Sequence, residues 1–193
     1  GGIYRYSTNY RHLTGDAIAL ALKHGIELKN TNYVQIHPTT FYTENETDRS
    51  FLISESVRGE GAVLLDKKME RFTDELQPRD VVTREIRKQM KKDGTDFVWL
   101  SMKPIDREQL ESHFPNIVKH CREYGYNVPD DCIPVVPAQH YFMGGIKVNL
   151  ESKTSMDQLY AVGETACNGV HGKNRLASNS LLESLVFAKR AAI

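Results

Sequence analysis

Apolar residues recur every three or four positions between residues 79 and 93, and this period predicts a helix. Val82, Ile86 and Met90 fall on one stripe, a proline precedes the segment, and Gly94 follows it. Proline is favoured where a helix begins, and glycine is favoured just after its end. We therefore expect one face of this helix to join a hydrophobic core.

A shorter helix is expected at residues 17–24, where Gly25 supplies the stop signal. The three residues before it, Thr14 to Asp16, are of types that cap helices. Asp16 has two interpretations at this point. Its carboxylate either caps the helix or accepts a hydrogen bond from a ligand hydroxyl at the helix start.

Residues 33–42 alternate between apolar and polar types like a strand, up to Pro38. Proline has no N–H for a sheet ladder, so we expect the strand to end there with His37 at its end. Strand ends are where α/β proteins place ligand-binding groups. A lone histidine is also a common satisfied core or surface residue, and both interpretations stay open. Further strands are predicted at 62–65, 97–100, 146–148 and 159–163.

A short helical segment carries Ser54, Glu55 and Arg58. Glu55 and Arg58 stand three residues apart, and the simplest interpretation is a surface ion pair worth well under about 1 kcal/mol. Arg79 stands in the first turn of the 79–93 helix, where a cation opposes the helix dipole. It is either a solvated side chain or one aimed into a cleft.

Two more helices follow in the middle of the chain. Asp106 and Gln109 form a capping-box pattern for the first, and Pro115 begins the second, which Gly125 ends. Prolines between residues 129 and 137 then punctuate the return of the chain.

Residues 164–184 predict a loop followed by a helix that begins near Ser178 or Asn179. A helix N-terminus offers unbonded N–H groups and a partial positive charge, and Arg175 adds a full one. The sequence therefore predicts an anion site here.

Two glycine-rich α/β segments, residues 1–37 and 141–193, flank a mixed block at 38–140. The expected fold class is α/β and α+β, with one domain inserted into another and a cleft between them. The polar groups near the joins suit a small dianion, because arginine binds a carboxylate with a bidentate fork. They are His37, Ser54, Glu55, Arg58, Arg79, His140 and Arg175. Since the chain opens on glycine and its last helical pattern still runs at Ile193, we expect an internal piece of a longer protein.

Composition argues against several other classes of protein. The chain has 193 residues, 40% of them hydrophobic, and equal numbers of Lys+Arg and Asp+Glu, 25 each. No basic field points to nucleic acid or to an anionic membrane. The three cysteines lack CxxC spacing, which argues against a disulfide framework or a zinc site and fits the cytoplasm. No apolar run reaches the ~20 residues that cross a bilayer.

Six motifs follow one another along the chain: TGD at 14–16, QIHPTT at 35–40, SESVRGEGA at 54–62, QPRDVV at 77–82, PAQHYFMGGI at 137–146 and HGKNRLASNSLLES at 171–184. Together they resemble the succinate dehydrogenase and fumarate reductase flavoprotein superfamily, and within it the L-aspartate oxidase branch. The last motif carries the assignment to that branch, because NRLASNSLLE stands where the dicarboxylate reductases usually read NRLGGNSLL.

The resemblance implies parts of a Rossmann-like FAD-binding domain at 1–37 and 141–193, around a mixed α+β capping domain at 38–140. It implies FAD as cofactor and no metal. The residues it places at FAD are Asp16, Glu164, Ser180 and Leu181. Those it places at the substrate carboxylates are His37, Ser54, His140 and Arg175. Arg79 matches the arginine that exchanges a proton with substrate, and Glu55 and Arg58 match its proton relay.

The implied reaction is oxidation of L-aspartate to iminoaspartate for quinolinate and NAD synthesis, with removal of the Cα proton on one side and hydride transfer to flavin on the other. Oxygen or fumarate would accept the electrons, and quinolinate synthase is a candidate partner. No GxGxxG turn for the FAD diphosphate occurs in these residues, so the chain by itself is expected to be inactive. Two alternatives remain: a succinate dehydrogenase or fumarate reductase flavoprotein, and a non-catalytic capping module.

Overall fold

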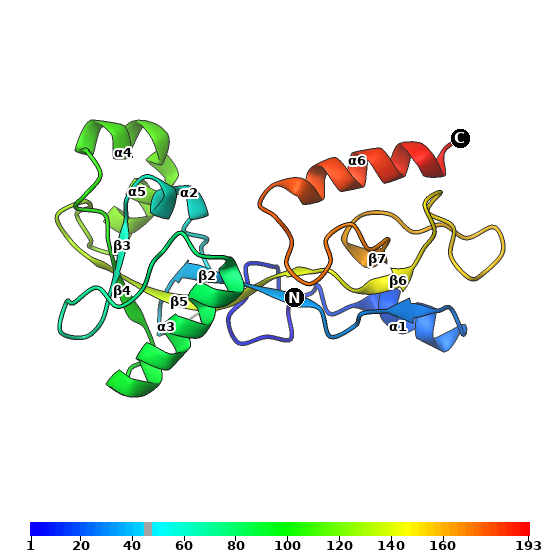
Figure 1. The fold of residues 1–193 in the computed structure, drawn as a ribbon, viewed down its shortest axis with the longest axis horizontal. Helices are drawn as coiled ribbons and strands as arrows, with labels where there is room; N and C mark the ends of the chain where they lie inside the picture. Colours follow the sequence, from blue (N-terminus) through cyan, green and yellow to red (C-terminus); the bar gives the residue numbers. More distant parts are fainter. Residues whose placement is uncertain (45–47) are drawn as a thin grey trace. The chain divides into compact units, whose positions relative to one another are not determined.

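The computed structural model describes residues 1–44 and 48–193, which divide into two compact units (Figure 1). The flanking unit comprises Gly1–Arg5, Asn9–Gln35 and Gln139–Ile193, and the central unit comprises Tyr6–Thr8 and Ile36–Ala138. Each unit has its own hydrophobic core. The mixed α/β and α+β character expected from the sequence is confirmed.

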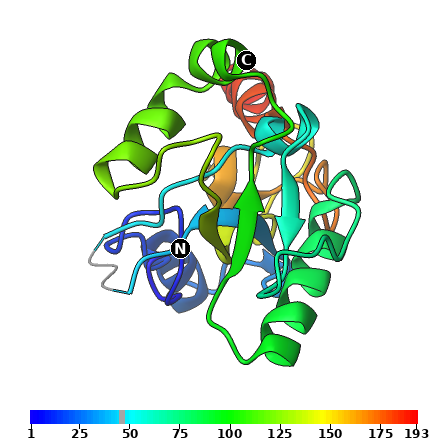
Figure 2. The ribbon, with the colours of Figure 1, turned by 90° about the vertical axis from the view of Figure 1, so that its left-hand side faces the viewer.

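A four-stranded sheet with the order β2-β5-β4-β3 is the centre of the central unit. β3 and β4 run antiparallel and lie side by side in Figure 2, and β4 is antiparallel to β5. Leu64, Leu100 and Ile133 lie in one row across three strands and are fully buried, so this face of the sheet is the core side. The strands are β2 (Val34–Phe41), β3 (Val63–Leu65), β4 (Val98–Ser101) and β5 (Ile133–Phe142).

Four helices complete the central unit: α2 (Glu55–Gly59), α3 (Arg79–Asp93), α4 (Arg107–His113) and α5 (Pro115–Glu123). The prediction for α3 is confirmed at both ends, and it packs on β4 with Val82 and Ile86 fully buried. Gly94 ends it in the left-handed region, at φ 69°. Asp106 caps α4 by accepting from the N–H groups of Glu108 and Gln109.

The prediction that Pro38 ends a strand was wrong. β2 continues through Pro38 to Phe41, so His37 lies in the middle of a strand and not at its end. β2 is at the edge of the sheet, where a residue without an N–H is tolerated. β5 likewise contains Pro134, which still contributes a carbonyl oxygen that accepts from the N–H of Tyr42 at 3.0 Å.

The flanking unit has a three-stranded sheet with the order β1-β6-β7, in which β6 is antiparallel to β1 and parallel to β7. Its core contains Ala21, Ile26 and Ile146. Gly144 precedes β6 and Gly145 begins it, because neighbouring backbone atoms leave no room for a side chain there. A Cβ on Gly144 would lie 2.0 Å from the carbonyl oxygen of Asn30. The elements are α1 (Asp16–Lys23), β1 (Leu28–Lys29), β6 (Gly145–Lys147), the 3-10 helix η1 (Gly163–Thr165), β7 (Ala166–Cys167) and α6 (Asn179–Ala191).

The helix expected at 17–24 and the one expected near residue 179 are confirmed as α1 and α6. The strand expected at 159–163 was wrong. Gly163 takes a left-handed φ of 73° and starts η1, and the strand follows at Ala166–Cys167. Asp16 does not cap α1 either: the cap is Gly15, and the Asp16 carboxylate accepts from the Thr14 hydroxyl at 2.9 Å.

Within the ranges that the structure describes, no helix is both long and apolar enough to span a bilayer.

Candidate functional site

Arg79 and Glu55 form a two-pronged ion pair in the central unit. Arg79 is the first residue of α3 and Glu55 the first of α2, so the ends of the two helices bring the side chains together. Nε and Nη2 of Arg79 donate to the same carboxylate oxygen of Glu55, at 2.9 and 2.6 Å. The Arg79 side chain is 8% exposed and that of Glu55 is 39% exposed. This contact gives a reason for a cation in the first turn of α3, and solvent still reaches its carboxylate.

Arg58 lies deeper, with only 2% of the residue exposed. Its Nη1 donates to the backbone carbonyl oxygen of Glu75 at 2.5 Å, whereas Nε and Nη2 are buried with no hydrogen-bond partner in the part of the chain that the structure describes. Burial lowers the pKa of Arg58, the nearby charges of Glu55 and Glu75 raise it, and that of Arg79 lowers it. A guanidinium with a lowered pKa is better able to release a proton than an exposed one.

The surface ion pair expected between Glu55 and Arg58 was wrong. Glu55 pairs with Arg79, and Arg58 turns into the core of the unit toward the loop that holds Glu75. The spacing of three residues correctly placed both side chains on one short helix, α2. Arg58 is buried, however, so its partner is a group inside the unit and not the half-exposed Glu55.

Ser54 and His37 belong to the same unit. Ser54 is the N-cap of α2, where its hydroxyl oxygen accepts from the N–H of Ser56 at 3.2 Å. His37 is buried, with Nδ1 3.0 Å from the carbonyl oxygen of Thr39 and 3.2 Å from its N–H. These local contacts fix the orientation of the His37 ring.

In the flanking unit, Arg175 is held by an aromatic ring and by the start of α6. Its guanidinium carbon lies 4.4 Å from the centre of the Tyr141 ring, and its Nη1 is 3.5 Å from the Ser180 hydroxyl. Gln35 donates to the backbone carbonyl oxygen of Arg175 at 2.7 Å. Arg175 is 5% exposed, so a buried cation sits on a scaffold of two strands and a helix end.

Tyr141 and His171 are site residues that sequence reasoning missed. The ring of His171 meets that of Tyr141 edge to face at 5.5 Å, and its Nε2 is buried without a hydrogen-bond partner. Burial and then the charge of Arg175 lower the pKa of His171, which favours the neutral ring. Burial raises the pKa of Tyr141. Both residues lie inside quoted motifs, so position in a motif was the available signal.

The remaining predicted residues also lie in the flanking unit. The Glu164 carboxylate accepts from the N–H of Phe142 at 2.9 Å, and burial raises its pKa. The His140 backbone oxygen accepts from the Asn9 side chain at 3.3 Å. Leu181 is 72% exposed on the first turn of α6, and Asp16 is exposed at the start of α1. The structure thus brings Arg175, Ser180 and Tyr141 together in one unit, and Glu55, Arg58 and Arg79 in the other.

Comparison with known proteins decides the family. The FAD binding domain family matches residues 1–181. The chain belongs to this FAD binding domain family. FAD is therefore its cofactor, as the motifs indicated.

Within this family, L-aspartate oxidases are close relatives. The enzyme of Clostridium perfringens is 54% identical over 193 residues, covering 100% of this chain and 44% of the relative. The enzyme of Nostoc sp. is 48% identical over 202 residues, covering 100% of this chain and 35% of the relative. The chain thus spans less than half the length of the curated relatives it matches.

Among solved structures, an E. coli quinol fumarate reductase has a TM-score of 0.88 at 33% identity, covering 99% of this chain and 36% of that one. A quinol–fumarate reductase with menaquinol molecules has a TM-score of 0.89 at 33% identity, covering 98% of this chain and 36% of that one. The predicted superfamily is confirmed.

Residues at the start of α6 fit the FAD of this family. The N-cap residue Ser178 makes no side-chain hydrogen bond to the helix. The Asn179 N–H donates to the Leu176 carbonyl oxygen at 3.4 Å, and the following N–H groups of the first turn are placed to bind a ligand. Leu176, Leu181 and Leu185 are each at least 70% exposed, which suits a broad apolar ring system. The buried, partnerless Nε2 of His171 offers a further polar contact in the same unit.

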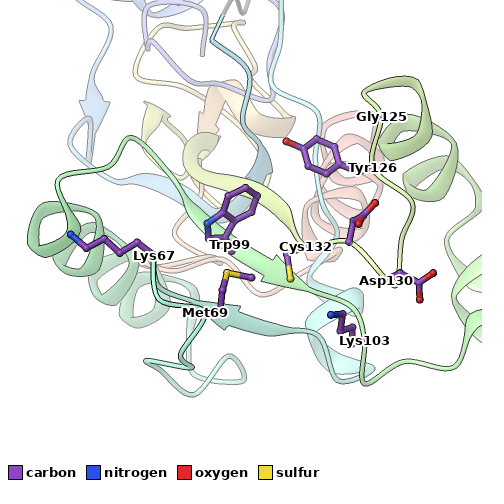
Figure 3. Close-up of a pocket in the computed structure, with 9 residues that line it drawn as sticks. Lys67, Met69, Trp99, Lys103, Gly125, Tyr126, Asp130 and Cys132 are labelled. Carbon is purple, nitrogen blue, oxygen red and sulfur yellow. The ribbon is translucent and has the colours of Figure 1, made fainter.

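The central unit also has a shallow hollow of about 660 Å³ around Trp99 (Figure 3). None of the predicted site residues lines it. Two of its charged groups are engaged by their own neighbours: Asp130 pairs with Arg107, and the Lys67 ammonium donates to the backbone oxygen of Asp93. The hollow therefore lacks the convergent polar groups of a small-molecule site.

Proposed function

We propose that this chain is part of an L-aspartate oxidase, which uses FAD to oxidise L-aspartate to iminoaspartate on the way to quinolinate and NAD. The observation that carries this proposal is the Arg79–Glu55 fork with the buried Arg58 in the same unit. Such a chain of groups could carry a proton between the half-exposed Glu55 and the buried Arg58. Identity of 54% to the Clostridium perfringens enzyme favours L-aspartate as the substrate.

Oxidation removes one proton and one hydride from the substrate. In our proposal the Arg79 guanidinium first passes a proton to the Glu55 carboxylate through the 2.6 Å contact and, once neutral, takes the proton from the substrate. Arg58 in its neutral form then accepts the proton from Glu55 and completes the relay. Lowering of the Arg58 pKa by burial assists this role, because a guanidinium with an ordinary pKa stays protonated. FAD, when bound, supplies the hydride acceptor.

The two substrate carboxylates need cations and hydrogen-bond donors. We assign this role to His37, Ser54, His140 and Arg175. The guanidinium of Arg175 is placed by Tyr141, so it enters the site with its orientation already set. Asp16, Glu164, Ser180 and Leu181 are assigned to FAD, with the uncapped start of α6 favouring negative charge on the reduced ring.

The domain assignment is part of the same proposal. Residues 1–37 and 141–193 would belong to the FAD-binding domain, and 38–140 would form the capping domain. Oxygen or fumarate would accept the electrons, quinolinate synthase is the proposed partner, and the cytoplasm is the proposed compartment.

A second function, the flavoprotein of a succinate dehydrogenase or fumarate reductase, is favoured by the TM-score of 0.88 to the E. coli fumarate reductase. Substrate preference separates the two. The full-length protein should reduce its FAD with L-aspartate and not with succinate, measured by bleaching of flavin absorbance without oxygen. Reduction by succinate alone would establish the second function.

A non-catalytic capping module is the third possibility. The 193-residue chain, purified by itself, should then show no flavin absorbance. Stoichiometric FAD in that chain would exclude this possibility.

A further inference from the structure

The loop between β3 and α3, residues 66–78, is built around the buried carboxylate of Glu75. Its Oε1 accepts from the N–H of Leu64 in β3 at 2.8 Å. Arg71 grips the same carboxylate, with Nε at 3.2 and 3.1 Å from its two oxygens and Nη2 at 2.6 Å from Oε2. The Glu75 side chain is 3% exposed, whereas that of Arg71 is 57% exposed. A negative charge is thus fixed inside the unit, with its cation on the solvent side.

The backbone of this residue also holds Arg58. Nη1 of Arg58 donates to the Glu75 carbonyl oxygen at 2.5 Å, and the other two guanidinium nitrogens are buried without partners. An unsatisfied buried donor costs roughly 1–3 kcal/mol. Among the described residues, the bond to Glu75 is the one hydrogen bond that the Arg58 guanidinium makes, and it therefore determines where the guanidinium lies.

We propose that Glu75 is a positioning residue of the proton path: its carbonyl oxygen places Arg58, and its carboxylate balances the buried positive charge. This inference rests on the proposed function, because it needs Arg58 to carry a proton. Glu75 would act through Arg58 and not on the substrate.

Three charged groups act on Arg58, and a fourth, Arg71, pairs with one of them, Glu75. Glu55 stands on α2, Arg79 on α3, and Glu75 and Arg71 on the loop. The charges of Glu55 and Glu75 oppose the lowering of the Arg58 pKa by burial. Loss of the Glu75 charge therefore lowers the pKa of Arg58 further. Loss of the exposed Arg71 charge leaves the negative charge of Glu75 without its neutralising partner and raises the pKa of Arg58.

The test uses the full-length protein with FAD and the pH dependence of kcat for L-aspartate. Glu75→Gln keeps the size of the side chain and an oxygen for the Leu64 N–H. The relay takes up a proton only when Arg58 is neutral. A lower pKa of Arg58 in Glu75→Gln should therefore move the part of the kcat profile that rises with pH to lower pH, by about one unit. Arg71→Gln should move the same limb to higher pH, by less, because water screens the exposed charge.

Asp74→Asn is the matched control, since Asp74 is an exposed carboxylate of the same loop that bonds to Leu76 and Gln77. Its profile should be that of the unsubstituted protein. Opposite shifts for Glu75→Gln and Arg71→Gln support the inference. Equal shifts, no shift, or the same shift in Asp74→Asn overturn it. If Glu75→Gln does not fold, the upward shift of Arg71→Gln decides.

The NMR titration of the Arg58 guanidinium carbon in the same variants separates this inference from the proposed function. An unsubstituted protein that does not oxidise L-aspartate refutes the function alone. Opposite shifts of the Arg58 titration would still support the balance of its charge by the Glu75 carboxylate, and an unshifted titration would overturn the inference.

Discussion

Replacement of Arg79 by leucine separates a role in proton transfer from a role in stability. The change removes two hydrogen bonds to one oxygen of Glu55, at 2.9 and 2.6 Å. Because Glu55 is 39% exposed, water screens the pair, and its contribution to stability is discounted to about 1 kcal/mol. A domain is typically stable by about 5–15 kcal/mol, so Arg79→Leu should remain folded.

The effect on turnover should be much larger. Loss of a general acid or base lowers the rate about 10²–10⁴-fold, which corresponds to about 3–5 kcal/mol of barrier. The assay is kcat for L-aspartate in the full-length protein, with the ratio of flavin to protein absorbance and the melting temperature measured on the same sample. We expect a loss of at least a hundredfold with FAD retained.

Arg84→Leu is the matched control for this prediction. Arg84 lies on the same helix with 61% of its side chain exposed, and it pairs with Asp80 at 3.4 Å. Its turnover should equal that of the unsubstituted protein. If Arg79→Leu keeps more than a tenth of the turnover, Arg79 is not the proton carrier. If Arg84→Leu loses as much activity as Arg79→Leu, the loss reports on the helix and not on the site.

Three further predictions test the surroundings of the site. Ile86→Ala opens a cavity at a fully buried position of α3 and should lower the free energy of unfolding by about 2–5 kcal/mol in a urea titration; a change below 1 kcal/mol would contradict the packing. Burial raises the pKa of Glu183, which accepts from Asn168, so folding favours its protonated form and this contribution falls as pH rises above about 4.5. Glu183→Gln should therefore raise the melting temperature at pH 7 more than at pH 4, and an equal effect at both would exclude the charge as the cause. Burial raises the pKa of Cys121 to about 12, so iodoacetamide at pH 8 should alkylate the partly exposed Cys132 first, as read by peptide mass spectrometry; the reverse order would contradict the burial.

Local signals predicted the long helices well, because each carried several agreeing cues. For α3 the stripe of Val82 and Ile86, the proline before it and the glycine after it gave both ends correctly. The strand at 159–163 rested on a short apolar run alone, and the left-handed Gly163 moved the true strand to Ala166–Cys167. Short apolar runs do not reveal where the backbone turns.

Side-chain partners were harder to predict than elements. Sequence spacing joined Glu55 to Arg58, whereas the fold joins Glu55 to Arg79, 24 residues later. The placement of His37 failed for a similar reason: whether a proline ends a strand depends on whether that strand is at the edge of its sheet. Pairings across the fold set both outcomes, and no local pattern encodes them.

The crowded glycine before β6 has a consequence for genetics. Gly144→Ala adds a single methyl group, but that carbon would fall 2.0 Å from a backbone oxygen of Asn30, which no side-chain rotation relieves. We therefore expect a Gly144→Ala allele to yield no folded protein, or to yield folded protein only below a threshold temperature. Saturation mutagenesis of this codon should therefore return glycine almost alone, at a position that touches neither cofactor nor substrate in our assignment.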